Sequence, residues 1–122
     1  MLSKFTKNLK PHVDAELVFA AHARAEGRPD VEFTHLENAH VIGQKSTRLH
    51  VKVHCLMLLW AIRNRHSREF FGQLPRIVGA ATKTAIGWVP DGNTGGANVS
   101  PFKSMPIKDE HADIIERARK DG

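Results

Sequence analysis

The chain has little cysteine, no tyrosine and no long apolar run. With Cys55 as its single cysteine it can form neither an internal disulfide nor a thiolate-rich zinc finger, so any metal site must use histidine and carboxylate ligands. Its longest apolar run, residues 55–62, is far shorter than the roughly 20 residues that cross a bilayer. The N-terminus lacks the apolar region and the small-residue cleavage site of a secretory signal. We therefore expect a cytoplasmic protein without a membrane-spanning segment.

Motifs of common enzyme and nucleotide-binding classes are missing as well. The glycine-rich segment 91–97 follows no strand pattern and lacks the Lys-Ser/Thr pair of a phosphate-binding loop. No serine stands in a nucleophile-elbow motif. The net charge of +5 favours acidic partners in general, but basic residues are spread along the chain among acidic ones, so nucleic acid is not the expected partner. These absences favour a binding protein over an enzyme.

Helical signals dominate what is present, and strand signals are weak throughout. Pro11 suits a first helical turn, Gly27 followed by Pro29 suits a helix end, and Ser46 suits an N-cap. The sequence predicts an all-α fold of antiparallel helical hairpins, a helical-repeat-like bundle of four to five helices in a single domain, 1–122. The helices are expected at 11–26, 30–42, 47–64, 67–87 and 109–120.

Two segments depart from this helical pattern. Residues 1–10 carry three lysines and are expected to form a loose basic arm. Residues 90–108 are rich in glycine and proline and are expected to form an irregular C-terminal crossover. Within the fourth helix, Pro75 is expected to kink or split the chain.

The chain also holds eight histidines, and four polar side chains of special interest surround the turn between the second and third helices. Glu37 and His40 are three residues apart, and His50 and His54 are four apart, so each pair shares one face of its helix. Because the intervening turn is short, the helices should be antiparallel neighbours, with His40 level with His50 and Glu37 facing His54. Three imidazoles and a carboxylate that converge in this way predict a transition-metal site.

The first helix offers one further candidate. Glu16 lies eleven residues before Gly27, and His40 lies eleven after Pro29, so antiparallel packing would bring the two to a similar height. Glu16 is therefore a candidate fifth ligand, or an acceptor for a ligand's ring N–H. A carboxylate-bridged di-metal site would need a second Glu-x-x-His motif, and the sequence has only one, at residues 37–40. A mononuclear site is the better prediction.

Simpler interpretations account for the same residues. Histidines on a helical hairpin can be solvated, or can hydrogen-bond to neighbours without any metal. The first two predicted helices also have the look of one helical-repeat hairpin, which favours an adaptor that binds another protein. A di-metal enzyme would require a homodimer to supply the missing carboxylates.

A resemblance to a known family rests on five long sequence segments, which lie at residues 4–9, 35–40, 47–54, 77–84 and 92–101. The chain resembles an uncharacterised family of short bacterial proteins, a domain of unknown function, over nearly its whole length. The resemblance implies an association with heavy-metal resistance and no established activity.

The sequence therefore predicts a small cytoplasmic transition-metal-binding protein that serves in sensing, buffering or delivery. Its ion would be zinc, copper, nickel, cobalt or iron, held by His and Glu side chains between the second and third helices. The alternative is a protein–protein interaction adaptor without a metal.

Overall fold

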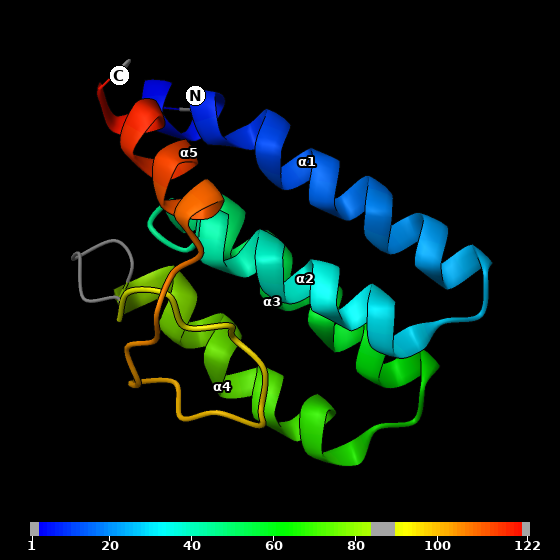
Figure 1. Ribbon diagram of the computed structural model, residues 1–122. Coiled ribbons are helices and arrows are strands. Elements are labelled where there is room, and N and C mark those ends of the chain that lie inside the picture. The colour runs from blue at the N-terminus through cyan, green and yellow to red at the C-terminus, as the bar shows by residue number, and fades with distance from the viewer. Residues whose placement is uncertain (1–2, 84–89, 121–122) are drawn as a thin grey trace.

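The computed structural model describes residues 3–83 and 90–120, and all of its regular elements are α-helices (Figure 1). The expected all-α class and helical-bundle architecture are thus confirmed. Helices α1 and α2 form one antiparallel hairpin, α3 and α4 form a second, and α5 packs beside the N-terminal part of α1. The bounds of the helices are α1 Lys4–Ala25, α2 Pro29–Gly43, α3 Thr47–Arg63, α4 Ser67–Lys83 and α5 Asp109–Lys120.

Helix α1 begins well before the predicted position. Ser3 is its N-cap, and the Ser3 hydroxyl accepts a hydrogen bond of 3.1 Å from the backbone N–H of Thr6. Leu9, in the segment predicted to be a loose arm, is fully buried in the core. Pro11 lies inside the helix rather than at its start. In the helix interior, proline removes a single backbone hydrogen bond. The prediction of a basic arm at residues 1–10 is therefore wrong for residues 4–10.

The second hairpin places α3 beside α2, where the candidate site lies. Ser46 caps α3, and its hydroxyl also lies 2.7 Å from the Thr6 hydroxyl, which ties this turn to α1. At the opposite end of α3, Trp60 packs against Phe33 and donates its indole N–H to the carbonyl of Pro29 over 3.0 Å. Contacts at both ends thus fix the position of α3 against the hairpin of α1 and α2.

Pro75 lies inside α4 without ending it, and the part of the predicted fourth helix at 84–87 falls outside the described residues. Residues 90–108 contain turns and no helix, and they lie across α4 before the chain enters α5 (Figure 1). Arg76 helps to hold this segment, because its Nη2 donates to the carbonyl of Val99 over 2.7 Å. In the described part of the chain, no helix combines the length and apolar character needed to cross a membrane.

The burial of Leu9 leads to a test of how α1 begins. Replacing Leu9 with alanine should lower the free energy of unfolding by about 2–5 kcal/mol, because the side chain leaves a cavity in a packed core. Val18→Ala on the same helix is the matched control, because Val18 is 55% exposed, and its effect should stay below about 0.5–1 kcal/mol. Urea denaturation measures both changes. Equal, small effects would show that residues 4–10 do not dock.

Candidate metal centre

Three histidines from two helices meet in the interior, next to the turn between α2 and α3. His40 of α2 is 2% exposed, and His50 and His54 of α3 are 8% and 3% exposed. The Nε2 atom of His40 lies 2.9 Å from that of His50 and 3.1 Å from that of His54. The Nε2 atoms of His50 and His54 are 3.1 Å apart. We call these three residues the histidine triad.

Hydrogen bonds at the far side of two rings determine where their protons lie. The carbonyl of Asn93 can only accept, so the Nδ1 atom of His40, 2.6 Å away, carries the proton and donates it. The Nδ1 atom of His54 lies 2.6 Å from Oε1 of Gln73. Since Nε2 of Gln73 donates to the carbonyl of Gly95, its Oε1 is the acceptor, and His54 donates through Nδ1. Neutral His40 and His54 therefore both present Nε2 lone pairs to the centre of the histidine triad.

The surroundings keep the histidine triad neutral. Burial above all, then the nearby His54 and His50, lower the pKa of His40 well below its usual value. Burial and His54 lower the pKa of His50 to about 3. Burial also lowers the pKa of His54 to about 4, although the hydrogen bond to Gln73 works in the opposite direction. Neutral imidazole is the form that binds a metal ion, so the site is ready for a ligand role at pH 7.

The separations among the three nitrogens suit a transition-metal ion. Metal–imidazole bonds are about 2.0–2.1 Å long, which places adjacent nitrogens about 3.3–3.4 Å apart on a tetrahedral ion and about 2.8–3.0 Å apart on an octahedral one. The observed distances of 2.9–3.1 Å fit three adjacent positions of an octahedron. A tetrahedral ion would need the rings to open by about 0.3 Å, which a side-chain torsion can supply.

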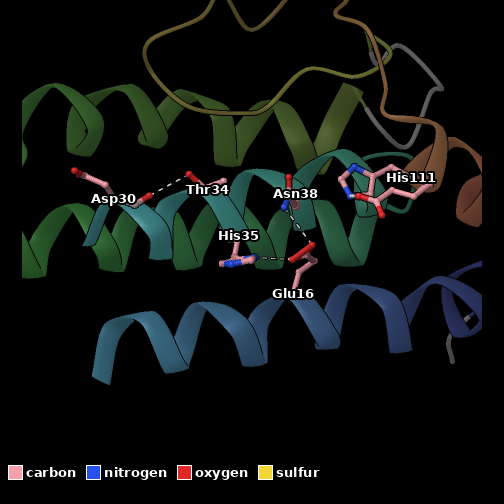
Figure 2. Close-up of polar contacts among 7 residues, drawn as sticks. Glu16, Asp30, Thr34, His35, Asn38 and His111 are labelled. Atoms are coloured by element: carbon pink, nitrogen blue, oxygen red, sulfur yellow. Dashed lines mark hydrogen bonds and ion pairs between the residues drawn. The ribbon is translucent and has the colours of Figure 1, made fainter. Parts of the chain in front are cut away.

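Of the five residues predicted as ligands, the structure brings together the three histidines and leaves out the two glutamates. Glu16 accepts hydrogen bonds from Nδ1 of His35 at 2.8 Å and from Nδ2 of Asn38 at 3.2 Å (Figure 2). These partners lie about 140° and 160° around α2 from His40, at 100° per residue, so α1 packs on the opposite side of α2. Matched height was therefore not enough to bring Glu16 to the site.

Glu37 is also displaced from its predicted place facing His54. Glu37 lies about 60° around α2 from His40. Its carboxylate accepts a hydrogen bond from the Thr94 hydroxyl, in the segment that follows α4. The ring partner of His54 is instead Gln73. Burial and the charge of Glu69 raise the pKa of Glu37, and the bond from Thr94 partly opposes this rise.

Three residues that were not predicted from the sequence contact the rings of His40 and His54 and hold them in place. Gln73 of α4 and the carbonyl of Asn93 accept the ring protons of His54 and His40. Gly95 closes over the His40 ring with φ +85°, and a Cβ at this position would lie only 2.5 Å from Cδ2 of that ring. The glycine-rich segment 91–97, predicted only to be part of an irregular crossover, thus also holds His40 in place. The only signal for that role was its density of Gly and Asn.

A cavity of about 250 Å³ opens directly beside the histidine triad. Its lining combines polar side chains with proline, glycine, alanine and phenylalanine residues. Apart from the histidine triad, its lining residues are Gln44, Pro75, Arg76, Gly79, Ala80, Pro90, Asn93, Gly95, Pro101 and Phe102. An ion held by three protein nitrogens would keep open coordination positions, and this cavity is where they would point.

The close approach of Gly95 to His40 can be tested with a matched pair of glycine variants. Gly95→Ala and Gly27→Ala both place a side chain at positive φ, +85° and +69°, which costs about 1–2 kcal/mol. Only at Gly95 would the new methyl group also collide with His40, because nothing lies within 4 Å at Gly27. Gly95→Ala should therefore lower the thermal midpoint several degrees further than Gly27→Ala. Equal shifts would contradict this packing.

The metal-free protein should lose stability as the pH falls from 7 to 5. Unfolded histidines take up protons near pH 6.5, whereas the folded pKa values are lowered, to about 3 for His50 and about 4 for His54, so acid favours the unfolded state. The loss should be roughly 2 kcal/mol per triad histidine, and Glu37, whose pKa is raised, offsets part of it.

Urea denaturation in the presence of a chelator, at pH 7, 6 and 5, measures this loss. The variant His22→Gln removes an exposed histidine and should leave the pH dependence unchanged. A denaturation midpoint that stays constant over this pH range would refute the assignment of three buried neutral imidazoles.

Comparison with known proteins identifies the family of this chain. A family model described as a protein of unknown function (DUF3703) matches residues 7–115, a span that includes the whole histidine triad, Gln73 and Asn93. No curated protein and no solved structure matches the chain.

Proposed function

We propose that this chain, which belongs to the DUF3703 family of proteins of unknown function, binds one transition-metal ion through the Nε2 atoms of His40, His50 and His54. The single observation that supports this most is the convergence of three buried Nε2 atoms within 3.1 Å of one another. The ring N–H groups of His40 and His54 donate to oxygen acceptors on the far side, the arrangement that usually orients metal-bound histidines.

A purely structural role for the histidine triad is less favourable. Because His40 and His54 both carry their protons on Nδ1, their Nε2 lone pairs face each other at 3.1 Å with no proton between them. His50 can supply at most one proton to the centre through its own Nε2. At least one close pair of nitrogens therefore repels in a metal-free centre, whereas a cation would attract all three lone pairs at once.

The donor set limits the identity of the ion. Three imidazole nitrogens without a thiolate suit zinc, copper, nickel, cobalt or iron. The ion would reach the site through the adjoining cavity, where exchangeable ligands could occupy its open positions. An ion held by three ligands and open to exchange fits sensing, buffering or delivery of a metal in the cytoplasm. We also propose that the protein functions in heavy-metal resistance.

A second candidate, a protein–protein interaction adaptor without a metal, is favoured by a different surface. Phe71, Leu74 and Val78 follow one face of α4 and are 68%, 43% and 65% exposed. Large apolar side chains exposed along one helix face are typical of a docking surface for another protein or a second copy of the chain. This surface carries no information about the histidine triad, so the two functions are separately testable.

Calorimetric titration of the chelator-treated protein with zinc, nickel and cobalt tests the proposal. We expect one ion per chain, and His50→Ala or His54→Ala should weaken binding at least about 100-fold by removing one of three ligands. His12→Ala, at an exposed position on α1, is the matched control and should bind as the native chain does. Unchanged binding in both triad variants would favour the adaptor.

A further inference from the structure

Two residues that line the cavity beside the histidine triad each carry a buried polar atom without a protein partner among the described residues. One is Oε1 of Gln44, a side chain that is only 1% exposed. The other is Nε of Arg76, whose two Nη atoms donate instead to the carbonyls of Gly72 and Val99. Leaving such an atom unsatisfied costs about 1–3 kcal/mol, and more for a charged group, so a complementary ligand would be stabilised here.

The two unpartnered atoms require hydrogen-bonding groups of opposite kinds, one an acceptor and the other a donor. The Nε–H of Arg76 needs an acceptor, and its positive charge favours an anionic oxygen. Oε1 of Gln44 needs a donor, such as a hydroxyl or an amino group. Among the described residues that line the cavity, Arg76 carries the only permanent charge, and a bound metal cation would make the cavity more positive still. Glu69 lies close enough to act on the charge of Arg76, but its carboxylate is held by Gln73 and the N–H of Ala97.

The size and lining of the cavity restrict the ligand further. A dry cavity of 150 Å³ in another protein accommodates benzene, so about 250 Å³ suffices for a small organic acid. Among the lining residues, Pro75, Ala80 and Phe102 offer apolar contacts to a short carbon chain. A bare inorganic anion has no carbon atoms and could not make these apolar contacts.

We propose that the cavity binds a small carboxylate bearing a hydroxyl or amino group, which bridges the metal ion and Arg76. One carboxylate oxygen occupies an open coordination position of the ion, the other accepts from Nε of Arg76, and the hydroxyl or amino group donates to Gln44. α-Hydroxy and α-amino acids have these groups in adjacent positions. This inference rests on the proposed metal site and specifies what completes its coordination. The protein would then carry its ion as a ternary complex.

Titration of the cobalt-loaded protein with lactate, propionate and lactamide tests the proposal. The visible absorption of cobalt reports changes in its ligands, and calorimetry gives the dissociation constants. Lactate should bind tightest. Propionate lacks the donor for Gln44, and lactamide lacks the charge for Arg76, so each should bind at least about tenfold more weakly.

Two variants test the contacts to Gln44 and Arg76 separately, and cobalt binding shows in each case whether the variant is still folded. Gln44→Met, close in volume, should leave cobalt binding intact and remove the preference for lactate over propionate. Arg76→Lys keeps the positive charge but loses the planar donor, and should weaken lactate binding about tenfold at unchanged cobalt stoichiometry. Loss of lactate preference in Gln44→Met alone already supports the proposal, even if Arg76→Lys folds poorly.

The possible failures are distinguishable. If the native protein takes up no cobalt, zinc or nickel, both the proposed function and this inference are overturned. If the native protein takes up one cobalt ion but its spectrum and heat of titration do not respond to lactate, the metal site stands and only the carboxylate proposal fails. Equal binding of all three probes would also overturn it.

Discussion

Three buried ring nitrogens that converge on one point form the constraint on which the rest of the site depends. His40, His50 and His54 can approach to about 3 Å only as neutral rings, because protonated rings this close together would repel in the buried interior. Neutral rings in turn require acceptors for their outer protons, and Asn93 and Gln73 supply these for His40 and His54. The segment after α4 is thus part of the centre, although it is not helical.

This dependence explains why elements far apart in sequence pack as they do. Gln73 is fully buried and uses both ends of its amide, accepting from His54 and donating to Glu69 and the carbonyl of Gly95. The carboxylate of Glu69 holds the same segment through the backbone N–H of Ala97. A single network of hydrogen bonds therefore runs from α4 through residues 93–97 to the rings on α2 and α3. A metal ion would add the only strong attraction at its centre.

Local patterns were sufficient to predict most of the helices, because apolar spacing, caps and breakers act within a few residues. The start of α1 was missed because Pro11 was given the first-turn position, whereas the cap at Ser3 and the burial of Leu9 decide the start in the folded protein. The meeting of the histidine triad was predictable for the same local reason. Its members flank one short turn, where antiparallel packing leaves little freedom.

The parts of the site that could not be predicted depend on how the helices are rotated and on distant segments. Height along a helix can be counted from a turn, but Glu16 faces the opposite side of α2, and only the packing of α1 reveals this. Gln73 and Asn93 lie 19 residues after His54 and 53 after His40, and nothing in a single sequence connects them to those rings. Local spacing thus identified the rings, and tertiary structure identified what supports them.

X-ray absorption spectroscopy of the protein purified without an affinity tag and loaded with one equivalent of zinc tests the central claim most directly. We expect three imidazole nitrogens at about 2.0–2.1 Å from the ion, with the scattering pattern of histidine rings, and one or more additional oxygen or nitrogen ligands. A spectrum with oxygen ligands alone, or with fewer than three imidazoles, would contradict it.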